Sequence, residues 1–227
     1  MIENQVQFIF KTICSFCLVL TLVVGVYGQS PVELELGAQA GVPFTVPLES
    51  LLTGPAGTYS SQAYERSAFS VGPAVAVVIH ERIAVEFDAL YKPIKFTSSS
   101  ASISTSTRGG SWEFPLIANY RFLSGPIRPF GGGGMLLGAS LFGTTETENT
   151  DNRTGVVTVR SDPFRAFFSQ LPAYIVNGGL EWRTSHVSIR PELRFTRWSG
   201  VDQSASDVRK QNQFEYLLGF SFRGFKR

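Results

Sequence analysis

Charged side chains recur at alternate positions along several segments of this chain. Within 186–198, Arg190, Glu192 and Arg194 are separated by single residues, Pro191 and Leu193. Side chains at this spacing lie on one face of a β-strand, where opposite charges pair with each other or across strands. The same patterning is found for Glu33, Glu35, Glu86, Asp88, Glu113, Glu181, Glu215, Arg82, Lys92, Arg121, Arg183 and Arg223.

The register of one strand pair predicts a specific ion pair. A tight turn at 184–185 would place Glu181 opposite Arg190, and Arg183 opposite Ser188. The expected network can be interpreted as a conduction path or ligand site, or as a polar plug that only stabilises the protein. The plug is favoured, because charges in a narrow interior must pair. The network comprises Glu33, Glu35, Glu86, Glu113, Arg121, Glu181, Arg190, Glu192, Arg194 and Glu215.

No other chemistry is indicated by residue type and spacing. The two histidines, His80 and His186, fall at predicted turns. There is no metal-ligand spacing and no Ser–His–acid cluster, and Gly131–Gly134 lacks the Lys-Ser/Thr of a phosphate loop. We therefore predict no catalytic residue, cofactor or metal. The net charge of +2 indicates no nucleic-acid partner.

The N-terminus has the pattern of a secretory signal peptide. Lys11 precedes the apolar run 12–26, and Gly28 follows at the expected cleavage position. A transmembrane anchor is the alternative, but the run is shorter than the ~20 residues that a spanning helix needs. We predict a signal peptide over 1–28 and one domain over 29–227. Both cysteines, Cys14 and Cys17, lie in the predicted signal peptide.

The mature chain has the pattern of an all-β protein. Alternation of apolar and polar residues predicts eight strands, separated by turn-forming residues. They are Val32–Val42, Arg66–His80, Arg82–Phe96, Gly110–Phe122, Arg128–Phe142, Pro172–Arg183, His186–Trp198 and Gln213–Phe225. In the fifth, the four consecutive glycines make the faces ambiguous, although Met135, Leu137, Ala139 and Leu141 suggest that the odd-numbered face is apolar.

A soluble barrel and a membrane barrel share this alternation and differ in which face points outward. The predicted strands have about 11–15 residues, longer than the ~5–6 of globular proteins and sufficient to span a bilayer. Aromatic residues near strand ends are typical of the girdles at membrane interfaces. The expected girdle contains Trp112, Tyr120, Trp182, Trp198, Phe214 and Phe222. The prediction is an eight-stranded, antiparallel, up-and-down transmembrane β-barrel.

Connection lengths agree with that topology. Short links around Glu81, at 123–127 and at 184–185 alternate with long ones at 43–65, 97–109, 143–171 and 199–212. Membrane barrels with both termini in the periplasm have short periplasmic turns and long extracellular loops. We therefore expect the long connections outside the cell, where 43–65 and 143–171 could contact extracellular ligands.

The eight strands, the signal peptide and the ending FEYLLGFSFRGF resemble the porin-type, outer-membrane-protein-A-like small β-barrel family. The resemblance covers Val32–Phe225. It implies location in a bacterial outer membrane, contact with outer-membrane lipid and a lumen of Glu–Arg pairs. It also implies that the barrel-assembly machinery recognises the last strand through Phe220 and Phe222, although Gly224, Lys226 and Arg227 depart from a terminal aromatic.

The expected function is that of a non-enzymatic envelope protein with a structural or surface-interaction role. One alternative is a narrow, porin-like channel for small solutes. Another is a lipid A-modifying barrel enzyme, which the positions of His80 and His186 at the predicted periplasmic turns disfavour.

Overall fold

The structure, a computed structural model, describes residues 32–45, 61–65, 67–99, 103–150, 154, 156–168, 173–199 and 212–223. The predicted signal peptide, 1–28, lies outside these residues. The described part forms one antiparallel sheet of eleven strands. They are β1 (Val32–Pro43), β2 (Ser61–Glu65), β3 (Ser70–Ile79), β4 (Ile83–Asp88), β5 (Leu90–Ser99), β6 (Ile103–Arg121), β7 (Ile127–Thr150), β8 (Val157–Phe168), β9 (Ala173–Arg183), β10 (Val187–Trp198) and β11 (Asn212–Arg223).

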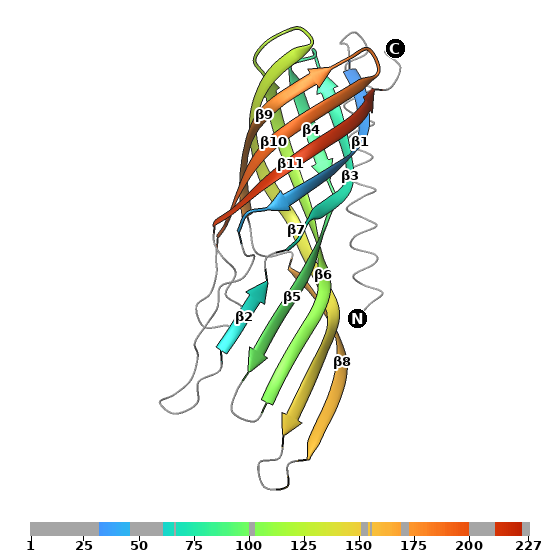
Figure 1. The fold of residues 1–227 in the computed structure, drawn as a ribbon. Coiled ribbons are helices and arrows are strands. Elements are labelled where there is room, and N and C mark those ends of the chain that lie inside the picture. The colour runs from blue at the N-terminus through green and yellow to red at the C-terminus, as the bar shows by residue number, and fades with distance from the viewer. Residues whose placement is uncertain are drawn as a thin grey trace.

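The sheet closes on itself as a barrel. β1 pairs with β11 on one side and with β3 on the other, and β6 pairs with β7. Since β4 and β5 together form one position in the wall, the closed order is β1, β3, β4–β5, β6, β7, β9, β10, β11. This confirms the predicted eight-stranded up-and-down barrel (Figure 1).

The third predicted strand is interrupted at one residue, Ala89, between β4 and β5. Ala89 lies against Pro73 of β3, and its backbone N donates to the carbonyl oxygen of Pro73 at 3.0 Å. Proline has no N–H to return the bond, so the ladder is broken at this point. The inward positions on either side remain in phase, because both Asp88 and Leu90 are buried.

The two faces of the wall carry opposite kinds of side chain. Outward residues are apolar and exposed, such as Leu36 at 56% and Leu193 at 61%, whereas inward Asp88 and Glu86 are exposed by 0% and 1%. A soluble barrel has its apolar face inside, so this arrangement is that of a barrel surrounded by lipid. The fold is therefore a transmembrane β-barrel. Among the described residues, no helix could cross a bilayer.

The fifth predicted strand, within β7, changes face partway along. Met135 and Leu137 point outward as suggested, but Ala139 is buried inside. The register between β6 and β7 shifts by one residue, from Glu113 opposite Ala139 to Pro115 opposite Leu136. A β-bulge of this kind reverses the parity of all later residues, which periodicity alone did not reveal.

The short turns are confirmed at 80–82, 122–126 and 184–186, and they lie at one end of the barrel, here called the turn end. His80 and Glu81 have positive φ angles of 51° and 58°, which non-glycine residues seldom adopt. Gly125, at φ 127°, occupies a conformation that glycine alone adopts readily.

The prediction of loops at 97–109 and 143–171 is wrong over most of their length. β5 continues to Ser99 and pairs with β6 from Ser104, while β7 continues to Thr150 and pairs with β8 along twelve residues. With β2, these extensions form a sheet beyond the barrel, at the end opposite the turns (Figure 1). We call β2, β8 and residues 96–99, 103–109 and 143–150 the protruding sheet. A Ser/Thr-rich composition predicts loops, but threonine also has high β-propensity, and here it forms strands. Of the other two expected loops, Ser61–Glu65 is strand β2, and most of the rest lies outside the described residues.

Candidate functional site

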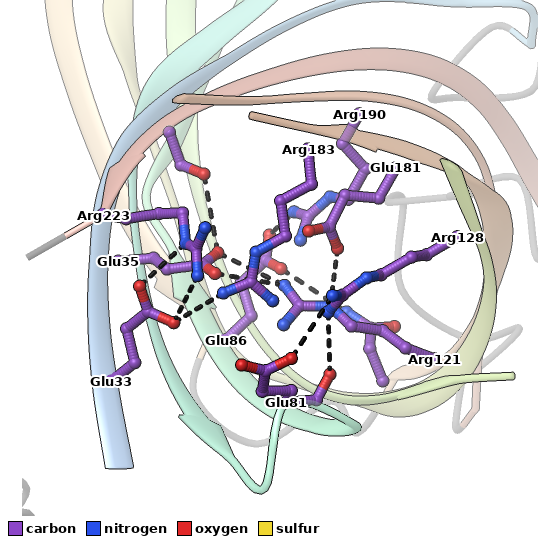
Figure 2. Close-up of polar contacts among 12 residues, drawn as sticks. Glu33, Glu35, Glu81, Glu86, Arg121, Arg128, Glu181, Arg183, Arg190 and Arg223 are labelled. Carbon is purple, nitrogen blue, oxygen red and sulfur yellow. Dashed lines mark hydrogen bonds and ion pairs between the residues drawn. The ribbon is translucent and has the colours of Figure 1, made fainter. Parts of the chain in front are cut away.

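The lumen is lined by charged residues in three layers, and the first lies at the turn end. Arg183 Nη2 of β9 contacts Glu33 Oε2 of β1 at 2.6 Å, and Arg223 Nε of β11 contacts Glu33 Oε1 at 2.7 Å. Arg121 Nε of β6 lies 2.5 Å from Glu181 Oε2, and its Nη2 lies 3.3 Å from Glu35 Oε2. Figure 2 shows these side chains converging on the centre of the barrel from several strands.

The middle layer joins opposite walls of the barrel. Arg190 of β10 contacts Glu86 of β4, and Arg194 Nη2 lies 3.0 Å from Asp88 Oδ2. Four neighbour steps around the barrel separate β10 from β4, so these two pairs cross the full lumen. Arg194 Nε also donates to Glu192 Oε1 on its own strand at 2.9 Å.

The third layer lies toward the protruding sheet. Lys92 Nζ of β5 contacts Glu113 Oε2 at 2.8 Å and Glu215 Oε2 at 2.9 Å. One ammonium group therefore pairs with two carboxylates, from β6 and β11. All ten residues of the expected lumen network are thus placed inside the barrel, each in an ion pair.

The specific pair expected from register does not form. Ser188 pairs with Arg183 as expected, and the same register puts Arg190 beside Glu181. However, the side chain of Arg190 reaches across the lumen to Glu86, and that of Glu181 contacts Arg121. In a closed barrel long side chains meet partners on distant strands, which a two-strand register cannot predict.

Two arginines near the turn end were misjudged from sequence. Arg82 was expected inside, but it is exposed in the turn, where Nη1 donates to the Tyr120 hydroxyl at 3.4 Å. Arg128 was not expected inside, yet it is buried and contacts Glu81 Oε2 at 3.3 Å. Arg128 shares even parity with the inward residue Phe130, a signal that the glycine run obscured.

Of the six residues expected in the aromatic girdle, Trp198 lies inside the barrel, and contact of the other five with the membrane interfaces stays a prediction. Tyr120, Trp182 and Phe222 are exposed near the turn end. Near the other end, Trp112 contacts Tyr91 with ring centroids 5.5 Å apart, and Phe214 contacts Phe195 at 4.8 Å.

Trp198 is the exception, because it is only 2% exposed and lies inside the barrel. It packs in an apolar cluster with Ile117, Leu136, Ala139, Ala173 and Ile175. Its even number puts it in phase with inward Arg190 and Arg194, so strand parity already excluded an outward position. Closeness to a strand end is therefore not sufficient to place an aromatic residue in the girdle.

Glycines in β7 allow two strands to approach each other. A Cβ at Gly132 would lie 2.4 Å from the Ala118 carbonyl oxygen, and a Cβ at Gly134 would lie 2.0 Å from that of Leu116. Both distances are too short for any side chain. The glycine run is therefore a site of close backbone packing between β6 and β7.

Two small cavities lie among the charged layers of the described residues. A cavity of about 20 Å³ lies beside Glu35, Glu86 and Arg190, and another of about 10 Å³ lies beside Lys92 and Glu215. Each has room for about one water molecule. Within the described residues, no group of three or more His, Cys, Asp or Glu side chains could hold a metal ion.

The chain matches no protein-family model and, at a significant level, no curated protein. Solved structures match at low identity. The N-terminal β-barrel domain of Pseudomonas aeruginosa OprF is 13% identical, with a TM-score of 0.41 over 86% of this chain and 100% of that chain. Neisserial surface protein A (NspA) is 13% identical, with a TM-score of 0.42 over 84% and 96%.

Ail, the attachment invasion locus protein of Yersinia pestis, was crystallised in complex with the heparin analogue sucrose octasulfate. It is 13% identical, with a TM-score of 0.39 over 86% of this chain and 99% of that chain. These are similarities of fold. The assignment of this chain to the eight-stranded barrels rests on its own strand pairing, which bears out the fold that the family resemblance implied.

Proposed function

We propose that this chain is a non-enzymatic protein of a bacterial outer membrane, whose closed barrel anchors the protruding sheet outside the cell. The observation that carries the proposal is the lumen. Arg190–Glu86 and Arg194–Asp88 join opposite walls, and the cavity beside them has a volume of about 20 Å³. A hydrated ion or a small solute needs a wider, continuous path. The barrel therefore acts as an anchor, with outer-membrane lipid around it, and interaction with extracellular ligands falls to the protruding sheet.

Conductance across planar bilayers distinguishes the anchor from a narrow channel. The purified, refolded barrel is expected to give no unitary current steps above the lipid background. The double variant Arg190→Ala/Arg194→Ala removes both side chains that cross the middle layer and serves as the comparison. Steps of defined size with the unmodified protein would establish a channel and contradict the closed lumen.

The orientation of the protruding sheet can be tested with single introduced cysteines, because both natural cysteines, Cys14 and Cys17, lie in the predicted signal peptide. Ser161 of β8 and Ser185 of a short turn are both exposed, at opposite ends of the molecule. A membrane-impermeant maleimide is expected to label Ser161→Cys in intact cells. Ser185→Cys is the matched control and should react only after the outer membrane is permeabilised. The reverse pattern would contradict the proposed orientation.

A further inference from the structure

Three buried side-chain atoms of the middle layer have no hydrogen-bond partner among the described residues. They are Nε of Arg190, Oε2 of Glu192 and Nη1 of Arg194, and the first of them borders a cavity. The other end of the Arg190 guanidinium is satisfied, because Nη2 donates to Glu86. Oε2 of Glu192 lies 3.7 Å from Nε, which is beyond hydrogen-bond distance. A buried donor left unsatisfied destabilises the folded protein, so a partner for this N–H is expected.

The cavity of about 20 Å³ lies next to this atom. Its polar lining includes Glu35, Gln39, Glu86, Arg190 and Ser221. The space exists because three inward positions around it, Ala74, Ala76 and Gly219, carry small side chains or none. A built Cβ at Gly219 would lie 3.6 Å from Arg190 Nε, which shows that Gly219 keeps the space beside Nε open.

We infer that this cavity binds one ordered water molecule, which accepts a hydrogen bond from Arg190 Nε–H and donates to the carboxylates of Glu35 and Glu86. The volume exceeds the roughly 10–15 Å³ that one water needs, and three hydrogen bonds are typical of buried waters. The charges of the lining also favour it. Two carboxylates face one guanidinium, and a water molecule placed among them can donate to both anions while accepting from the cation.

The stability of the Gly219→Ala variant distinguishes a cavity that holds a water molecule from an empty one. In Gly219→Ala the added methyl group meets no atom closer than 3.5 Å, so it fits without a clash. In a dry cavity, filling and reduced chain entropy would leave stability unchanged or raise it. In a cavity that holds water, the methyl group displaces the water molecule and leaves Nε–H without a hydrogen-bond acceptor. We expect the folding equilibrium constant of Gly219→Ala to fall about tenfold in urea titrations.

Gly219→Ser is the rescue variant, because its hydroxyl group can accept from Nε–H in place of the water. It is expected to recover most of the loss. Gly131→Ala is the matched control, since a Cβ at Gly131 also meets nothing closer than 3.5 Å but lies on the outer face. It should leave the equilibrium constant unchanged or slightly raised.

A direct measurement is magnetisation transfer from water protons to the Arg190 Nε–H in NMR spectra of the labelled barrel in micelles. Transfer in the wild-type protein that is lost in Gly219→Ala would support the bound water. A Gly219→Ala variant as stable as the wild type or more stable, or a wild-type Nε–H without transfer from water, would overturn it.

Discussion

At the scale of single residues, the lumen contains three arginines, Arg121, Arg190 and Arg194, that each lie within ion-pair distance of carboxylates from two strands. Arg194 contacts Asp88 across the barrel and Glu192 on its own strand. It is only 3% exposed, and Asp88 is fully buried. Removing one member of a buried ion pair leaves an uncompensated charge in a medium with little water, which costs more than the pair itself contributes.

Arg194→Ala is therefore expected to lower the free energy of unfolding by about 3–5 kcal/mol, through the unpaired Asp88 and Glu192. The measurement is a urea titration followed by gel mobility of the unboiled protein. Arg197→Ala is the control, because Arg197 lies on the same strand and is exposed. Equal stability of Arg194→Ala and Arg197→Ala would contradict the role of Arg194 in the middle layer.

Sequence periodicity was sufficient to predict which residues face the lumen, but not which residues meet there. Alternation placed Glu86, Asp88 and Arg194 inside, because strand parity is a local property. The partners of Arg190 and Glu181 depend on the diameter of the closed barrel and on the strand that lies opposite. The position of Trp198 was predicted wrongly for another reason. Its closeness to a strand end predicts the outer girdle, whereas its even number in the strand places it inside the barrel.

At the scale of elements, the seam between β6 and β7 combines two departures from a regular ladder. The β-bulge near Glu113 shifts the register by one residue, and Gly132 and Gly134 allow the strands to approach closely. The four consecutive glycines are visible in the sequence, whereas the bulge leaves no mark in the hydrophobic pattern. Apolar residues occur on both faces at Leu136 and Leu137, so parity could not be followed there.

Gly134→Ala is expected to destabilise the barrel by about 1–3 kcal/mol, because its Cβ would lie 2.0 Å from the Leu116 carbonyl oxygen and must displace backbone. The same urea titration measures this loss. Gly131→Ala provides the comparison within the same glycine run. If both variants were equally stable, the close approach of β6 and β7 would not depend on Gly134.

We expect the barrel to stay folded when the protruding sheet is disrupted. Thr147 lies in β7 between Thr105 of β6 and Arg160 of β8. Thr147→Pro removes a backbone donor and disrupts a central strand, so that protease added to intact cells should cleave within 143–168. The barrel should still show its heat-dependent gel mobility. Loss of that mobility would show that the barrel requires the protruding sheet.

At the scale of the whole molecule, the charged interior and the apolar exterior make the fold dependent on its surroundings. Closure of the barrel leaves no open strand edge in the wall, and its apolar outer face suits lipid or detergent rather than water. The unboiled protein should therefore run as a compact species on detergent gels and shift on boiling. A heat-indifferent product in the soluble periplasmic fraction would contradict the membrane barrel.

The ion pairs of the lumen also have a consequence for assembly. Glu33 contacts Arg183 and Arg223, which follow it by 150 and 190 residues in the sequence. Arg190 and Glu86 are separated by 104 residues, and Arg194 and Asp88 by 106. These four ion pairs form only when strands from both ends of the chain are in place. A partly closed barrel would leave some of these charges unpaired at the depth of the hydrocarbon core. Pairing in the lumen therefore favours the complete barrel over partly closed intermediates.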